Sequence, residues 1–307
     1  MRGIQLTAMA QTEISTTAAL KYALTLRREL AARNAAFAAH SGAPHVTSFG
    51  GCPVTVYEPY ENGQKHGNFL DQSYSAILDK AEWRKRLEKV HSQASRALPR
   101  AARLWSELDS CNSTDALLMN VFCFPAILER SDLRGLLGIE NGTLPEFGFK
   151  AHVPLVNGTD RTEVDMKLGS LLLESKLTES DFQTQLKLVV ERYRDFKAVF
   201  DSRLLPVTGE RYVSYQLIRN VLAAHATGSS FCVLLDARRP DLLEAWYAIM
   251  LCILVSDLRL RCKVLTWQEL AEALPAELQA FLDLKYGIVP PGKHASAIDV
   301  EVGSQSI

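Results

Sequence analysis

Two carboxylates and one lysine within residues 162–179 are the side chains of this sequence best suited to chemistry: Asp165, Glu174 and Lys176. Carboxylates held close together repel each other. A hard divalent cation such as Mg²⁺ removes that repulsion and needs only one or two protein carboxylates. A lysine beside the metal can hold, or help to deprotonate, a water whose pKa the metal lowers. Together these groups predict metal-assisted hydrolysis of a phosphodiester.

A β-hairpin is the local structure that would bring these side chains together. Residues 162–168 and 171–177 are rich in Val, Leu and Met, and Gly169-Ser170 suits a two-residue hairpin turn. The resulting register places Asp165 opposite Glu174, and Cβ atoms of opposed residues lie about 4.5–5.5 Å apart. The hairpin therefore predicts that both carboxylates face the same small volume.

The alternation of side chains along a strand divides this hairpin into two faces. Glu163 and Lys176 fall opposite each other on the face of Asp165 and Glu174, which makes Glu163 a further candidate metal ligand. The other face is expected to be core: Val164, Met166, Leu168, Leu171, Leu173 and Leu177. A solvated face with a Glu163–Lys176 ion pair explains the charges equally well without any function.

Asp165 followed by Glu174-Ser175-Lys176 after an apolar run resembles the PD-(D/E)XK motif of the restriction-endonuclease-like nucleases. Val164 stands where that motif often has proline, a departure frequent in the superfamily. The phrase Tyr215-Gln216-Leu-Ile-Arg219-Asn220 is similar to a glutamine-bearing helix that follows the E-x-K strand in some branches. Residues 113–122 resemble a helix opening in a bacterial branch, and the whole resemblance covers residues 110–275.

The resemblance implies an α/β fold with a mixed central sheet flanked by helices, here preceded by a helical N-terminal extension. The matching elements are a helix at 114–129, strands at 147–155, 162–168 and 171–177, a helix at 211–225 and a strand at 231–236. We therefore expect a mainly helical region with a loop-rich segment over residues 1–110, a nuclease-like core over 111–290 and a tail over 291–307.

The resemblance also implies a nuclease that depends on Mg²⁺ or Mn²⁺ and acts on nucleic acid, with DNA favoured over RNA. Asp165 and Glu174 would bind the metal, and Lys176 would position the water. A homodimer is compatible with the sequence but is not determined by it. The alternative is a catalytically inactive protein of this fold that binds nucleic acid or a protein partner.

Supporting roles fall to residues outside the E-x-K stretch. Gln216 would assist catalysis, while Tyr215 and Arg219 would contact the substrate. Gln216 and Arg219 share one helix face, which is explained equally well by a salt-bridged surface. The position of a further acid stays open among three residues: Glu163, Glu146 and Glu129.

Composition sets broad limits on these hypotheses. With 307 residues, of which 47% are hydrophobic, the sequence is typical of a soluble globular protein of one or two domains. The net charge of −1 does not by itself indicate a polyanionic partner. Neither a secretory signal nor a membrane-spanning run is apparent. The six cysteines form no zinc-type spacing. Four of them lie in apolar runs, which predicts buried thiols in a reducing, cytoplasmic compartment: Cys123, Cys232, Cys252 and Cys262.

Periodicity predicts the remaining elements. Helices are expected over residues 15–39, 75–108 and 275–286, and from Ser180 or Asp181 to about residue 200. The second of these helices carries a basic stripe, Arg96, Arg100 and Arg103, which suits either a phosphate backbone or solvent. The strand at 231–236, a helix at 240–257 and a second strand at 262–266 predict a parallel crossover.

Overall fold

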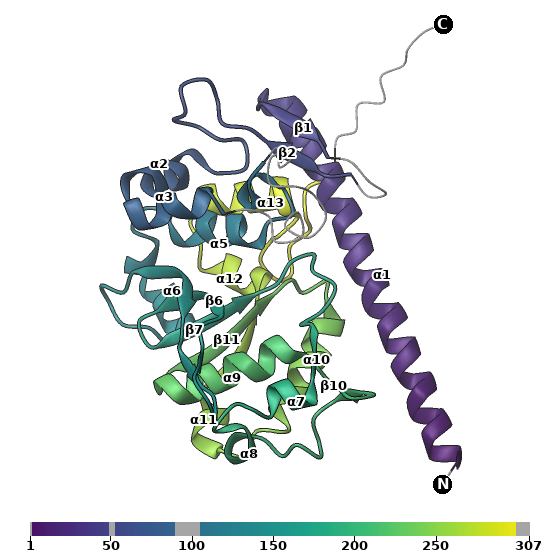
Figure 1. Ribbon diagram of the computed structural model, residues 1–307. Coiled ribbons are helices and arrows are strands. Elements are labelled where there is room, and N and C mark those ends of the chain that lie inside the picture. Colours follow the sequence, from purple (N-terminus) through teal and green to yellow (C-terminus); the bar gives the residue numbers. More distant parts are fainter. Residues whose placement is uncertain (1, 49–52, 90–104, 299–307) are drawn as a thin grey trace, which may run out of the picture. The chain divides into compact units, whose positions relative to one another are not determined.

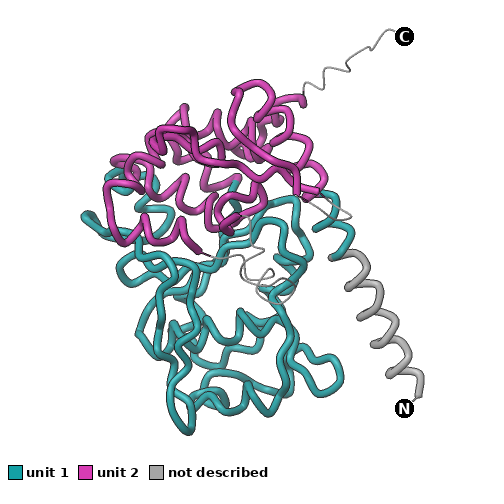
Figure 2. Tube along the Cα trace, turned by 45° about the horizontal axis from the view of Figure 1, so that its top comes forward, with its two compact units in different colours: residues 1–25, 128–267 teal, residues 26–127, 268–307 magenta. Residues whose placement is uncertain are grey.

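The computed structural model describes residues 2–48, 53–89 and 105–298 (Figure 1). The chain divides into two compact units, each made from two segments (Figure 2). Unit 1 comprises Met1–Thr25 and Leu128–Trp267, and unit 2 comprises Leu26–Ile127 and Gln268–Ile307. The domain boundaries expected after residues 110 and 290 stay a prediction.

Unit 1 is built around a mixed five-stranded sheet with the strand order β12-β11-β7-β6-β3 (Figure 1). Its strands are β3 (Pro145–Lys150), β6 (Glu163–Leu168), β7 (Leu171–Ser175), β11 (Ser230–Leu235) and β12 (Cys262–Thr266). β6 is antiparallel to both β3 and β7, whereas β11 is parallel to both β7 and β12. The sheet is therefore the predicted meander extended by parallel strands, and the predicted mixed α/β class is confirmed.

Smaller elements complete unit 1. The additional strands are β4 (Val153–Pro154), β5 (Thr159–Asp160), β8 (Thr184–Leu186), β9 (Val207–Thr208) and β10 (Arg211–Val213). The helices are α6 (Ser131–Leu137), α7 (Lys187–Val190), α8 (Phe196–Val199), α9 (Tyr215–Thr227), α10 (Pro240–Met250) and α11 (Ser256–Leu260). Two short helices lie at the unit boundaries, η3 (Ile127–Glu129) and α12 (Trp267–Glu272).

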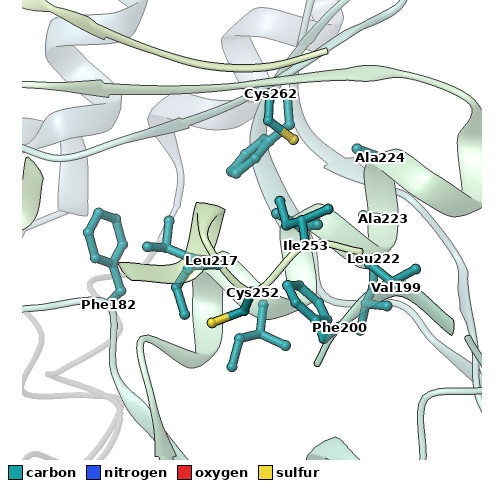
Figure 3. Close-up of a cluster of buried hydrophobic side chains, with 14 of the residues drawn as sticks. Phe182, Val199, Phe200, Leu217, Leu222, Ala223, Ala224, Cys252, Ile253 and Cys262 are labelled. Carbon is teal, nitrogen blue, oxygen red and sulfur yellow. The ribbon is translucent and has the colours of Figure 1, made fainter. Parts of the chain in front are cut away.

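The apolar core of unit 1 joins α9 and α10 to one face of the sheet. Figure 3 shows part of this cluster, including side chains of α9. Leu217 and Leu222 of α9 belong to the same buried cluster as Phe231 of β11. Trp246 of α10 contacts the Phe231 ring edge-on, with centroids 5.4 Å apart. Since α9 follows the hairpin in sequence and covers the sheet, it is placed to send polar side chains toward β7.

The helix predicted from Ser180 or Asp181 to residue 200 is wrong. The segment instead forms strand β8, the short helix α7, a turn and the short helix α8. β8 pairs with β10, so that Thr184 lies opposite Val213. Gln183, just before β8, has a φ of 61°, which a continuous right-handed helix does not allow. Strand pairing with a distant segment therefore prevails over the local helical pattern.

Three other predicted helices are shorter than expected. The helix predicted over 114–129 ends at Phe122, and η3 follows it as a separate element. The helix predicted over 211–225 begins at Tyr215, because residues 211–213 form β10. The helix predicted over 240–257 ends at Met250 and a separate helix, α11, follows. The break coincides with an isolated β-bridge between Phe200 and Ile253.

Unit 2 is formed by most of the N-terminal third of the chain together with its C-terminal segment. Its elements are β1 (His45–Thr47), β2 (Thr55–Tyr57), α2 (Asp71–Asp79), α3 (Ala81–Leu87), η2 (Glu107–Asp109), α5 (Thr114–Phe122) and α13 (Ala276–Tyr286). The first helix, α1 (Arg2–Ser41), is longer than the predicted 15–39 and enters this unit at Leu26. The helix predicted over 75–108 is divided, and its basic stripe, Arg96, Arg100 and Arg103, lies outside the described residues.

A buried lysine organises the interior of unit 2. Lys285 of α13 is completely buried, and its Nζ donates to the backbone oxygen of Gly67 and to Oδ1 of Asn68, both at 2.9 Å. The same nitrogen lies 4.1 Å from the centre of the Tyr57 ring. Burial lowers the pKa of Lys285 well below its usual range, and nearby Cys111 only partly opposes this.

Replacing Lys285 with methionine is expected to change how stability depends on pH. Because the folded-state pKa is lowered, the unfolded chain binds more protons, and stability rises with pH between the folded and unfolded pKa values. Methionine cannot titrate, so the melting temperature of the wild type relative to Lys285→Met should increase from pH 7 to pH 9.5. Thermal unfolding at both pH values measures this, and a difference that stays constant would contradict it.

The five cysteines in the described residues are buried free thiols: Cys111, Cys123, Cys232, Cys252 and Cys262. All of them except Cys111 were predicted to be buried. Across the described part of the chain, no helix combines the length and apolarity that a bilayer crossing requires.

Candidate active site

The predicted hairpin is present, and the three residue pairs nearest its turn have the predicted register, but the ladder ends before the predicted Asp165–Glu174 and Glu163–Lys176 pairs. β6 and β7 are neighbours in the sheet, joined by a turn at which Gly169 has a φ of 56° (Figure 1). The ladder begins with Leu168 opposite Leu171 and runs to Met166 opposite Leu173. A two-residue turn containing a left-handed glycine sets this register, and the register brings Asp165 toward the end of β7.

Asp165 makes contact with β7 through its side chain. Its Oδ2 accepts a hydrogen bond of 2.8 Å from the backbone N–H of Ser175. Ser175 lies between Glu174 and Lys176, so this bond fixes the Asp165 carboxylate beside the E-x-K triplet. The first acid of the motif is thus positioned by the backbone of the strand that carries the other two residues.

Glu174 is held at both of its carboxylate oxygens. Oε1 forms a 2.8 Å ion pair with Lys176 Nζ, and Oε2 accepts a 2.6 Å hydrogen bond from Asn220 Nδ2. Glu174 is 1% exposed and Lys176 is 5% exposed. The alternative of a solvated hairpin face is therefore wrong, because the charged pair lies inside the protein beneath α9.

Lys176 is fixed by its backbone as well as by its side chain. Its N–H donates to the Leu234 oxygen at 2.8 Å, which ties it to the parallel strand β11. Burial alone would lower the pKa of Lys176, but the carboxylates of Glu174, Glu179 and Asp165 raise it above its ordinary range. The amine is consequently protonated, which suits holding a water or a negative charge and does not suit removing a proton.

Three predicted acids lie at separate places. Glu163 of β6 pairs with Lys150 of β3, and its backbone oxygen accepts a 2.9 Å bond from Arg219. Glu146 of β3 is exposed and forms a 3.3 Å ion pair with Lys167. Glu129 lies in η3, far along the sequence from the hairpin. Within the described ranges no three His, Cys, Asp or Glu side chains cluster closely enough to hold a metal ion.

The predicted helix residues lie on α9. Tyr215 is half-buried, and its hydroxyl is 2.9 Å from that of Tyr193, which in turn donates to Asp160. Gln216 is partly exposed, and its backbone N–H donates to the Phe182 oxygen at 3.0 Å. Arg219 is buried and directs its guanidinium to Asn220 and to the backbone of β6.

Sequence reasoning missed two residues of this site. Asn220 contacts Glu174 directly, whereas Gln216 was the predicted supporting residue. An amide directly before the apolar run Val221–Ala224 was the signal available in the sequence. Glu179 was the other omission: it acts on Lys176 electrostatically, and its Oε2 accepts a 2.8 Å bond from the Leu177 N–H.

The donor set of Asp165 and Glu174 fits a hard divalent cation in type and number. Mg²⁺ binds through oxygen and usually takes only one or two protein carboxylates. An ionised carboxylate offers about four acceptor positions, so the two hydrogen bonds to Glu174 leave others for a ligand. Asp165 and Glu174 are the residues that would hold the ion.

Comparison with known proteins decides the family. Residues 34–287 match the family model described as Restriction Endonuclease associating with ARP. This chain belongs to that family. Neither the curated proteins nor the solved structures gave a match.

Membership confirms the suspected restriction-endonuclease-like identity and the fold class. The match includes the whole hairpin and α9, so Asp165, Glu174, Lys176 and Asn220 all lie inside it. It also begins at residue 34, well before the expected start at 110. Much of unit 2 is therefore common to the restriction endonucleases associating with ARP.

Proposed function

We propose that this restriction-endonuclease family member is a divalent-metal-dependent nuclease that hydrolyses phosphodiester bonds in DNA. The observation that carries the proposal is the joining of two carboxylates and an ammonium at one point of the sheet. Asp165 binds the backbone of Ser175 at 2.8 Å, and Glu174 pairs with Lys176 at 2.8 Å.

Each side chain has a distinct role in this proposal. Asp165 and Glu174 hold Mg²⁺ or Mn²⁺, which when bound lowers the pKa of a water and stabilises charge on the phosphoryl oxygens. Lys176 is protonated and donates hydrogen bonds, so it orients the attacking water or stabilises the developing negative charge. Tyr215 and Gln216 of α9 keep their proposed supporting roles, whereas the buried guanidinium of Arg219 binds Asn220 and the Glu163 backbone instead of a substrate.

A cleavage assay with the purified chain tests this function. Supercoiled plasmid, single-stranded DNA and RNA are each incubated with Mg²⁺, Mn²⁺ or EDTA. We expect cleavage of DNA with either metal and none with EDTA. The Asp165→Asn variant should be inactive under the same conditions. Cleavage that persists unchanged in EDTA would refute metal dependence.

Replacing Lys176 with methionine is expected to lower the cleavage rate by about 10²–10³-fold, because a preorganised charged donor is removed from the reacting centre. Lys167→Met is the matched control: Lys167 lies on β6 of the same hairpin and pairs with exposed Glu146. Single-turnover rates on one DNA substrate compare the two variants. Equal rates in both would remove Lys176 from the chemistry.

A non-catalytic role in binding a partner is the second candidate. It is favoured by the burial of Glu174, both of whose oxygens are already bonded, and by a family description that names association with ARP. The melting temperature separates the two: an increase with Mn²⁺ in the wild type that is absent in Asp165→Ala supports the enzyme. We also propose a cytoplasmic location, in keeping with the buried free thiols.

A further inference from the structure

A buried amide connects the carboxylate of Glu174 on β7 with the guanidinium of Arg219 on α9. Asn220 has no exposed surface, and its Nδ2 donates to Glu174 Oε2 at 2.6 Å. Its Oδ1 accepts from Arg219 Nε at 3.1 Å and from Arg219 Nη2 at 3.0 Å. One side chain therefore satisfies a carboxylate on one side and a guanidinium on the other.

The orientation of this amide follows from the chemistry of its neighbours. A carboxylate only accepts hydrogen bonds and a guanidinium only donates them, so the NH₂ group must face Glu174 and the oxygen must face Arg219. Arg219 is itself anchored, because its Nη2 donates to the Glu163 backbone oxygen at 2.9 Å. The chain of bonds from β6 through α9 to β7 prevents the amide from rotating.

We propose that Asn220 is a positioning residue that fixes the Glu174 carboxylate for metal binding, an inference that rests on the proposed function. Lys176 holds Oε1 and Asn220 holds Oε2, so the plane of the carboxylate is defined at both oxygens. Groups that hydrogen-bond to metal ligands orient them, and their loss commonly weakens metal binding by about 10–100-fold.

Two substitutions at this position separate the roles of the amide. Asn220→Asp keeps the shape and still accepts from Arg219, but places an acceptor against Glu174. Asn220→Leu removes both donor and acceptor without adding a charge. The charged groups around the site, among the described residues, include Glu174 of β7, Lys176 just after β7, Asp165 of β6, Glu179, Arg219 and Asp160.

The aspartate variant should be sensitive to pH. When it is ionised, two carboxylates oppose each other. When it is protonated, its hydroxyl donates to Glu174 as the amide does. The two opposed carboxylates bind a proton more tightly in the folded protein than in the unfolded chain. The shared proton therefore stabilises the folded variant at low pH, and this stabilisation is lost as pH rises. At pH 8 we expect Asn220→Asp to melt about 5–10 °C below the wild type, and at pH 5 at most half that gap.

The leucine variant supplies the comparison. Its melting deficit should be the same at pH 5 and pH 8, because leucine does not titrate. Titration calorimetry with MnCl₂ should show binding to Asn220→Leu that is about 10–100-fold weaker than to the wild type. These measurements need no cleavage activity.

The outcomes distinguish the two levels of the proposal. Asn220→Asp with wild-type melting at both pH values, or Asn220→Leu with wild-type Mn²⁺ affinity, overturns the role of Asn220. A wild type that neither binds Mn²⁺ nor cleaves DNA overturns the proposed function. In that case the pH-dependent gap of Asn220→Asp still reports whether Asn220 holds Glu174.

Discussion

Replacing Glu174 with glutamine is expected to lower Mg²⁺-dependent DNA cleavage by at least about a thousandfold. Glutamine keeps the shape but loses the charge that a hard cation requires and that neutralises buried Lys176. Glutamine also places two hydrogen-bond donors against each other. If the new amide oxygen faces Lys176, its NH₂ faces the NH₂ of Asn220, whose oxygen is held by Arg219.

The measurement is the single-turnover rate at saturating Mg²⁺, with circular dichroism showing that the variant is folded at the assay temperature. Glu210→Gln is the matched control, since Glu210 is an exposed acid on the loop before β10. This variant should cleave DNA at a rate within twofold of the wild type. Full activity in a folded Glu174→Gln protein would end the proposed mechanism.

Replacing Arg239 with leucine is expected to destabilise the protein by about 3–5 kcal/mol, a large effect for one side chain. Arg239 is completely buried and donates to the backbone oxygens of Leu177, Glu179 and Ser180 at 3.3, 2.7 and 3.2 Å. It also pairs with Asp241 at 2.8 Å. Leucine would leave these acceptors without their donor, and the oxygen of buried Leu177 would have no water to replace it.

The Arg239 bonds hold the chain directly after Lys176, so the loss should reach the site as well as the fold. Urea unfolding followed by tryptophan fluorescence measures the change, since Trp246 and Trp267 are buried in unit 1. Arg203→Leu is the control: it removes a surface pair with Asp201 in which the arginine is 86% exposed, and it should change stability by less than about 1 kcal/mol. Equal losses of unfolding free energy in the two variants would contradict the stabilising role of Arg239.

The sequence was sufficient to predict the hairpin because its information is local. Alternating Val, Leu and Met positions, a Gly-Ser turn and opposed acids determine register and face without knowledge of distant contacts. The strand at 262–266 was predicted for a similar reason, since a short apolar run between helices fits a buried parallel strand.

Long-range contacts account for what could not be predicted. β8 exists because it pairs with β10, some 25 residues later, and no local pattern in residues 180–200 encodes that partner. The burial of Glu174 and Lys176 depends on α9 covering β7, and the choice of Asn220 over Gln216 depends on the rotation of α9. The alternation of side chains along the strands carries no information about which element covers Glu174.

The location of bound Mn²⁺ shows whether Asp165 and Glu174 hold the metal ion. Crystals of the full chain soaked in MnCl₂ would be measured at a wavelength where manganese scatters anomalously. We expect an anomalous peak in contact with the carboxylates of Asp165 and Glu174, and its loss in Asp165→Asn crystals. A peak elsewhere, or none in a crystal that leaves this site accessible, would contradict it.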